Sequence, residues 1–262
     1  MMIAAREVEQ YLATFNEAGR LNAEEVFLYG GPDDAVRGIC VCWMATAPAL
    51  AHAAAEGCNL VVCHEAADMR EYPVWAAYTK DDAPWMVDVA RLEQIEKHGI
   101  TVLRVHSTVD PTHVGPALWD AVGLPKPGFS GWFYSHHHVE PTAVSEWAAR
   151  IRQGLGLSHV RVTGDPARVV TEVGTCWGGG GLDRSMHVWV RELVPRGIEA
   201  LIVGETSDFT QRVAMESGVV LLEAGHSVSE DPGLERLAAD IGRRFPETKV
   251  IFRPQEVPWV TQ

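Results

Sequence analysis

Three segments of the sequence each place a histidine and a carboxylate close together, directly after a run of apolar residues. The pairs are His64 and Glu65 after "LVVC", His106 and Asp110 after "VLRV", and His226 and Glu230 after "VVLLEAG". Imidazole and carboxylate together are a ligand set of zinc, iron and manganese sites. The recurrence of this pattern predicts a metal site assembled from segments that are far apart in the chain.

Single pairs of this kind also have ordinary structural explanations. Asp110 is followed by Pro111, which fits a helix N-cap with proline at the first helical position. His64 and His106, each taken alone, could be polar groups that are satisfied beneath a loop. The metal interpretation therefore depends on the recurrence of the pattern. Without a metal site, each of the three histidine and carboxylate pairs would need its own separate structural explanation.

The segment after His226 is only partly explained by helix capping. Ser227 and Glu230 fit a capping box, but a helix capped at Ser227 would contain Pro232, which has no N–H to donate. We therefore expect the helix to start at Ser229 or Asp231. Glu230 would then lie beside His226 rather than one helical turn further along.

The order of the apolar runs predicts an α/β fold. The runs "GICVCWMA" (38–45) and "CNLVVC" (58–63) flank the helix-like segment "TAPALAHAAAEG" (46–57), which makes one βαβ unit and favours parallel strands. Similar alternation continues to the "KVIF" run near the C-terminus. The histidine and carboxylate pairs would then follow the C-terminal ends of strands, where ligands bind in parallel sheets.

Composition excludes several classes of protein. There are 35 acidic and 22 basic residues, and the net charge of -13 argues against binding to nucleic acid. No apolar run approaches the roughly 20 residues that cross a bilayer, and no signal peptide is recognised. The five cysteines lie mostly in apolar stretches, which is typical of reduced, buried thiols. We therefore expect a cytoplasmic protein that does not contact membranes.

Several further features leave alternatives open. The glycine run 178–181 could cradle an anion with backbone N–H groups or could be a flexible turn. His136 and His138 would share one face of a strand and could take up metal, although we interpret them as adventitious. The aromatic-rich loop 66–85 could gate a site, contact another subunit or form a small satellite core. "GLPKPGFSG" (123–131) is the best candidate for a domain boundary.

The three motifs, taken together, resemble those of the Nif-three-like dinuclear metal centre family, also called GTP cyclohydrolase I type 2 homologues. "LVVCHEA" resembles the strand that leads into the paired-histidine motif of the family, with Glu65 in place of the second histidine. "VHSTVD" resembles its "HT" stretch with a following aspartate, and "AGHSVSE" resembles its C-terminal motif. "VGE" stands where the family has "TGD", so that Glu205 replaces the aspartate.

The resemblance implies metal ligands and an assembly. The implied ligands are His64, Asp110, His226 and Glu230, with Glu230 bridging two ions, and Glu65 is a further candidate ligand. The implied subunit has two α/β domains, the second inserted in the first: residues 1–125 completed by 224–262, and residues 126–223. The family also implies a homohexameric ring with metal sites facing an internal cavity.

Such a centre would carry one or two divalent ions, which we expect to be zinc, iron or manganese. We expect a metal-dependent hydrolase that acts on a small molecule, for example a nucleotide or another phosphate ester, with Glu65 and Glu230 as catalytic candidates. If Glu65 is not a ligand, Glu65 or Glu205 could act as general base. The alternatives are a ring-forming regulatory or structural protein without turnover, and a lapsed site that retains only the fold.

Overall fold

The computed structural model describes residues 2–66 and 85–258 and has the expected mixed α/β architecture. The chain forms two compact units, one of residues 1–109 and 234–255 and one of residues 110–233 and 256–262. The domain boundaries proposed from the sequence, at 125/126 and 223/224, stay a prediction. The aromatic-rich loop lies outside the described residues, apart from its first and last positions.

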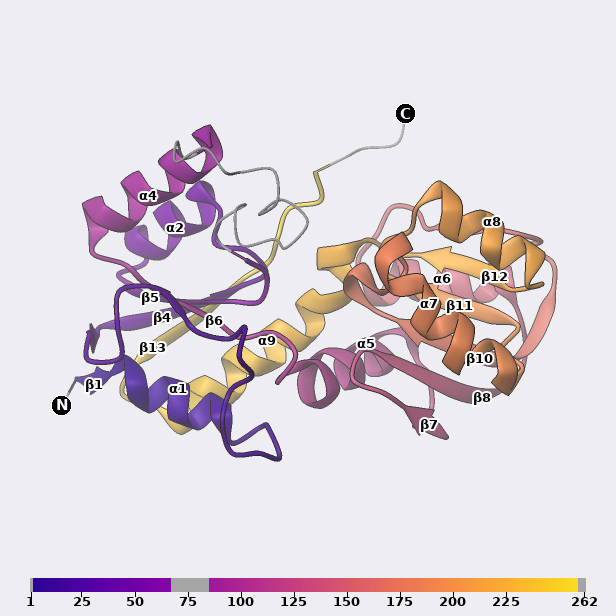
Figure 1. Ribbon diagram of the computed structural model, residues 1–262, viewed down its shortest axis with the longest axis horizontal. Coiled ribbons are helices and arrows are strands. Elements are labelled where there is room, and N and C mark those ends of the chain that lie inside the picture. Colours follow the sequence, from indigo (N-terminus) through magenta and orange to yellow (C-terminus); the bar gives the residue numbers. More distant parts are fainter. Residues whose placement is uncertain (1, 67–84, 259–262) are drawn as a thin grey trace. The chain divides into compact units, whose positions relative to one another are not determined.

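The first unit is built on a five-stranded sheet. Its strands, in spatial order, are β13 (Lys249–Arg253), β4 (Gly38–Cys42), β5 (Leu60–Cys63), β6 (Thr101–Arg104) and β2 (Phe27–Tyr29). The first four are parallel and β2 is antiparallel. One face is covered by α2 (Ala47–Ala55) and α4 (Met86–His98), and the other by α1 (Ala5–Ala13) and α9 (His226–Arg244) (Figure 1). A short ribbon pairs β1 (Ile3–Ala4) with β3 (Ala35–Val36).

Burial of both faces explains why the central strands read as continuous apolar runs. In β4, Ile39 and Val41 pack with α1 and α9, whereas Cys40 and Cys42 pack with α2. Both cysteines are buried thiols that form no disulfide with the described residues, and burial raises the pKa of the Cys40 thiol to about 12. These thiols therefore act as small apolar side chains, as expected from the sequence.

The second unit is built on a six-stranded mixed sheet. Its strands, in spatial order, are β7 (Phe129–Ser130), β8 (Tyr134–Ala143), β10 (Val169–Cys176), β11 (Ala200–Val203), β12 (Val220–Glu223) and β9 (Arg161–Thr163). The three strands β10, β11 and β12 are parallel. Helices α5 (Gly115–Val122) and α6 (Val144–Gly154) lie on one face, and α7 (Asp183–Glu192) and α8 (Asp208–Glu216) on the other (Figure 1).

The expected start of the last helix was wrong, because α9 begins at His226 and contains Pro232. Gly225 has φ of 111° and its N–H donates to the carbonyl of Gly204 at 2.7 Å, which fixes the turn before the helix. The N–H of Ser229 then donates to the carbonyl of Gly225 at 3.0 Å. Tertiary packing of the buried apolar side chains further along α9 outweighs the one intrahelical bond that Pro232 cannot make.

The expected cap at Asp110 also differs from the structure. Asp110 opens a π-helical turn, η2 (Asp110–Val114), and α5 starts only at Gly115 with Val114 at its N-cap position. π-turns inside helical segments are uncommon and frequently occur at functional sites. In the described part of the chain, no helix has both the length and the apolar character needed to cross a membrane.

A directed chain of hydrogen bonds crosses the core of the second unit at His137. The carbonyl of Pro125 can only accept, so Nδ1 of His137 donates to it at 2.7 Å. In the neutral ring Nε2 accepts from the Ser135 hydroxyl at 2.6 Å, and Ser135 then accepts from Thr175 at 2.5 Å. Trp119 Nε1 donates to Thr175 at 3.3 Å. Because His137 is 0% exposed and a charged ring would lose its hydration there, the network requires a neutral imidazole.

This requirement predicts a loss of stability in mild acid. Burial lowers the pKa of His137 to about 4, whereas an unfolded histidine has a pKa of about 6.5. The unfolded chain thus binds more protons between these values, and stability is full above pH 6.5 and falls as the pH drops. We expect a loss of about 2 kcal/mol between pH 7.5 and 5 from this group. Urea unfolding of His137→Gln should show a shallower pH dependence than wild type, and an unchanged slope would contradict the prediction.

Candidate metal centre

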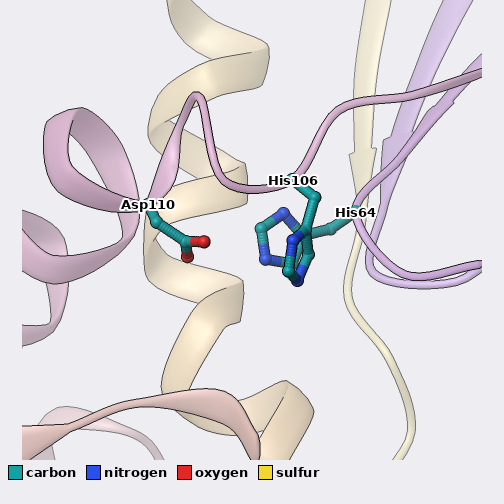
Figure 2. Close-up of side chains that lie close together, drawn as sticks. All are labelled: His64, His106 and Asp110. Carbon is teal, nitrogen blue, oxygen red and sulfur yellow. The ribbon is translucent and has the colours of Figure 1, made fainter. Parts of the chain in front are cut away.

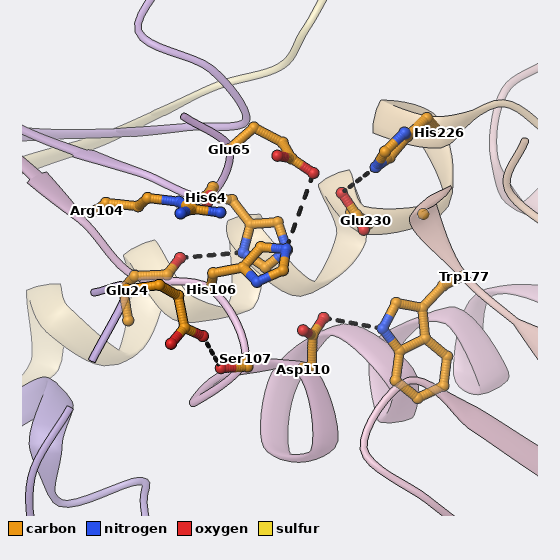
Figure 3. Close-up of polar contacts among 12 residues, drawn as sticks. Glu24, His64, Glu65, Arg104, His106, Ser107, Asp110, Trp177, His226 and Glu230 are labelled. Carbon is orange, nitrogen blue, oxygen red and sulfur yellow. Dashed lines mark hydrogen bonds and ion pairs between the residues drawn. The ribbon is translucent and has the colours of Figure 1, made fainter. Parts of the chain in front are cut away.

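The ends of β5 and β6 bring three chemically active side chains together in the first unit. His64 and Glu65 directly follow β5, and their N–H groups donate to the carbonyl of Trp43 at 3.0 and 2.8 Å. His106 follows β6, and its ring lies 4.6 Å from the ring of His64, centroid to centroid. Nε2 of His106 is 3.8 Å from Oε1 of Glu65 (Figure 3). His64 and Glu65 are buried, at 0% and 6% exposed.

A backbone contact fixes which nitrogen of His64 carries the proton. Nδ1 lies 3.1 Å from the carbonyl oxygen of Val105, which can only accept, so Nδ1 carries the proton and donates. The lone pair of the neutral ring is therefore on Nε2. A second ring nitrogen held in this way orients a metal-binding histidine and strengthens it as a ligand. Nε of Arg104 also donates to the carbonyl of His64, at 3.3 Å.

A buried carboxylate holds the loop that follows β6. Oε1 of Glu25 accepts from the N–H of His106 at 2.6 Å and from the N–H of Thr108 at 2.8 Å. Oε2 accepts from the hydroxyl of Thr108 at 2.5 Å and from the N–H of Asn22 at 2.6 Å. Glu25 is 3% exposed, so these bonds form in a site of low dielectric. It fixes the backbone from which the His106 side chain projects.

Asp110, in the second unit, is oriented by a tryptophan. Oδ1 of Asp110 accepts from Nε1 of Trp177 at 2.9 Å (Figure 3). Both side chains are buried, at 2% exposed, and a Cβ atom on Gly115 would lie 2.5 Å from the Trp177 ring. Glycine at 115 therefore leaves the space in which Trp177 holds the carboxylate. The indole therefore fixes the orientation of the carboxylate.

His226 and Glu230 lie one turn apart on α9. Nε2 of His226 is 3.7 Å from Oε2 of Glu230 (Figure 3), and Nδ1 is 3.0 Å from Oε2 of Glu205. Because a carboxylate accepts, Nδ1 donates to Glu205, and in the neutral ring the Nε2 lone pair faces Glu230. Glu205, the residue of the "VGE" motif, thus supports His226 as a carboxylate supports a metal-binding histidine.

The glycine run packs against these two residues. A Cβ atom on Gly178 would lie 1.9 Å from Oε1 of Glu230, and one on Gly179 would lie 3.1 Å from Cε1 of His226. Gly178 has φ of 56° and its N–H donates to Oγ of Ser229 at 2.9 Å. Glycine at these two positions lets the backbone pass directly beside His226 and Glu230. The two alternatives weighed from the sequence, an anion cradle and a flexible turn, stay predictions.

Two groups of described side chains each offer ligand atoms within 4.8 Å of one another. They are His64, His106 and Asp110 (Figure 2), and Glu65, His226 and Glu230. Each of the five ligand candidates from the sequence belongs to one or the other of these two groups. Their assignment as metal ligands or catalytic residues stays a prediction. His106 was noted at a strand end but was not included among the candidates.

The donor chemistry of both groups fits a divalent metal ion. One group offers two imidazoles and a carboxylate, and the other offers one imidazole and two carboxylates. Such nitrogen and oxygen donors suit zinc, iron and manganese. His64 and His226 each have Nδ1 committed to an acceptor, which orients both rings and places the lone pair of the neutral ring on Nε2.

Curated relatives share part of this sequence. Proteins named GTP cyclohydrolase 1 type 2 homolog from Pseudomonas aeruginosa and Vibrio cholerae are 27% identical over 107 residues and 31% identical over 102 residues. These alignments cover 41% and 38% of this chain and 39% and 38% of the relatives. The chain therefore spans about two fifths of the length of the curated relatives it matches.

Solved structures show the same fold over nearly the whole chain. A structure described as "protein ybgI, unknown function" has a TM-score of 0.80 and 21% identity, covering 98% of this chain and 100% of its own. A Bacillus cereus protein related to NIF3 has a TM-score of 0.77 and 12% identity, covering 100% of this chain and 99% of its own. At these identities the likeness establishes the fold.

A family model extends the sequence match beyond the partial alignments. The model described as Duf34/NIF3 (NGG1p interacting factor 3) matches residues 24–258, a range that includes all three histidine and carboxylate motifs. This is the family that the motifs resembled. The chain therefore belongs to the Duf34/NIF3 family.

Proposed function

We propose that this chain is a metal-dependent hydrolase whose two ligand groups together form one dinuclear centre. One ion would be held by His64, His106 and Asp110, and the other by Glu65, His226 and Glu230. The observation that carries this proposal is that His64 and His226 each have Nδ1 tied to an acceptor, leaving Nε2 as the nitrogen for a ligand. These contacts orient both rings in the way that a metal-binding histidine is held.

The side chains around the proposed centre have distinct tasks. Two bound divalent ions would lower the pKa of a shared water towards 7 and neutralise charge on a substrate phosphate. Glu65 would serve as a ligand in this arrangement, and its Oε1 lies 3.8 Å from Nε2 of His106, a candidate ligand of the other ion. Trp177 holds Asp110 in one orientation and Glu205 holds His226, so that both side chains are pre-positioned.

The substrate class we propose is a small phosphorylated molecule, a nucleotide among them. The name of the curated relatives refers to a purine nucleotide, and it supports this class without defining the reaction. The net charge of -13 repels anions at long range, so the ions themselves would have to attract the substrate. The homohexameric ring implied by the family resemblance stays a prediction.

Metal content and Glu230 test this proposal directly. We expect up to two ions per chain in the purified protein, measured by elemental analysis, and hydrolysis of nucleotide or phosphate-ester substrates that chelators abolish. Glu230→Gln should lose at least one ion and lower activity about 100-fold, because a neutral amide is a poor replacement for an anionic ligand. Glu235→Gln is the matched control, since Glu235 lies exposed on the same helix.

The outcomes separate the competing functions. Zero bound metal after supplementation would reject the centre. Stoichiometric metal without turnover, combined with loss of the oligomer on chelation, would favour the ring-forming structural alternative. Metal-dependent turnover that persists unchanged in Glu230→Gln would show that the reaction takes place elsewhere.

Gly178→Ala tests whether the close approach of the glycine run to Glu230 matters for metal binding. The new Cβ would overlap Oε1 of Glu230, and the backbone at φ of 56° is unfavourable for alanine. We expect metal affinity to fall at least 10-fold, measured by competition with a chromogenic chelator. Gly197→Ala is the control, because Gly197 has φ of 82° but open space around its Cβ position. Equal metal affinity in the two variants would contradict the prediction.

Glu25→Gln tests the support of the loop after β6. An amide keeps one acceptor oxygen but turns an NH2 group towards donors that Oε2 now satisfies. We expect a 10- to 100-fold loss of metal affinity and an altered visible spectrum of the cobalt-substituted protein, with the fold retained. Glu17→Gln is the control, because Glu17 is an exposed carboxylate of the same unit. An unchanged cobalt spectrum in Glu25→Gln would show that this carboxylate does not position the ligands.

A further inference from the structure

The consecutive histidines 136–138 divide between the two faces of β8. His137 points into the core network, whereas His136 and His138 lie on the opposite face, as the strand period requires. On that face both imidazoles meet Glu172 of the neighbouring strand β10. Nε2 of His136 donates to Oε2 of Glu172 at 2.8 Å, and Nδ1 of His138 donates to Oε1 at 2.7 Å.

The register of the two strands explains how one carboxylate reaches both rings. Glu172 is directly opposite His138, and Gly174 is directly opposite His136. Because Gly174 has no side chain, nothing on β10 stands between His136 and the diagonal Glu172. The carboxylate is therefore shared between two imidazoles that project from one strand face.

We propose that His136, Glu172 and His138 form a second metal-binding site, separate from the ligands of the proposed dinuclear centre. Two imidazoles and one carboxylate are a donor set for Zn²⁺ and Cu²⁺. With neutral imidazoles the cluster has one negative charge, which a divalent cation would offset. The three donors come from adjacent strands of one sheet, so the backbone that carries them is already fixed.

Closure onto an ion requires two local changes. Each ring must move its proton to the other nitrogen, so that Nε2 of His136 and Nδ1 of His138 present lone pairs; no net proton is released when the rings are neutral. The imidazoles now contact different carboxylate oxygens, and His138 must turn for the donors to converge. The His138 side chain is 79% exposed and can turn, whereas His136 and Glu172 are 18% and 29% exposed.

Zinc titration calorimetry of the full chain tests this site. Wild type should bind one more Zn²⁺ per chain than His138→Ala, with an affinity weaker than that of the buried ligand groups, because the site is open to water and the rings must rearrange. Glu172→Gln should lose the same additional ion. His187→Ala is the matched control for removing an exposed imidazole from the same unit, and it should bind as wild type does.

A spectroscopic measurement keeps the test independent of folding and of the proposed centre. Cu²⁺ bound at the additional site should show paramagnetic resonance splitting from two imidazole nitrogens, reduced to one in His138→Ala. Equal zinc stoichiometry in wild type and His138→Ala would overturn the proposal, as would copper spectra without nitrogen coupling that depends on His138. Glu230→Gln should keep the additional ion, so that failure of the dinuclear centre and failure of this site give different results.

Discussion

The burial of negative charge is the constraint on which this structure depends most. Glu65, Asp110 and Glu230 are 6%, 2% and 3% exposed, in a chain whose net charge is already -13. Moving a carboxylate out of water is expensive unless hydrogen bonds or cations compensate it. Hydrogen bonds do part of this work, as Trp177 does for Asp110. Divalent cations would offset the remaining charge most directly.

A second layer of side chains determines how the ligand candidates are presented. The Val105 carbonyl and the Glu205 carboxylate fix the protons of His64 and His226, while Glu25 holds the backbone that carries His106. These groups are on different elements from the residues they orient. Consequently the geometry of the ligand groups follows from the packing of the sheets and not only from the motifs themselves.

The sequence predicted well which residues follow the strand ends, but it predicted poorly which other side chains hold those residues in place. An apolar run followed by a histidine and a carboxylate is a local pattern, so the pairs at 64–65, 106–110 and 226–230 could be found without a structure. Glu25 could not, because an acidic residue in a loop looks like any solvated residue until the fold buries it. Glu205 was recognised by its motif position, but its contact with His226 spans 21 residues and depends on the sheet register.

The start of α9 shows why local rules failed at the site itself. Proline at 232 argued for a later helix start, since a helix beginning at His226 loses one backbone bond there. The early start nevertheless places Glu230 one turn from His226 and brings both against the glycine run. The rule that proline is avoided inside a helix is thus broken next to the ligand candidates. Functional sites are places where such departures from helix propensity are expected.

The proposed dinuclear centre and the proposed site at His136, Glu172 and His138 differ in how far their imidazoles are already prepared for a metal ion. This difference sets the order in which we expect the two sites to bind metal. In His64 and His226 the proton already sits on the nitrogen away from the ligand groups, so an ion would meet a prepared lone pair. In His136 and His138 the nitrogens that face Glu172 carry the protons, and binding must first reverse both tautomers. The free-energy cost of this rearrangement makes metal binding weaker. Buried, prepared groups should therefore fill at low metal concentration, and the exposed cluster on β8 and β10 only after them.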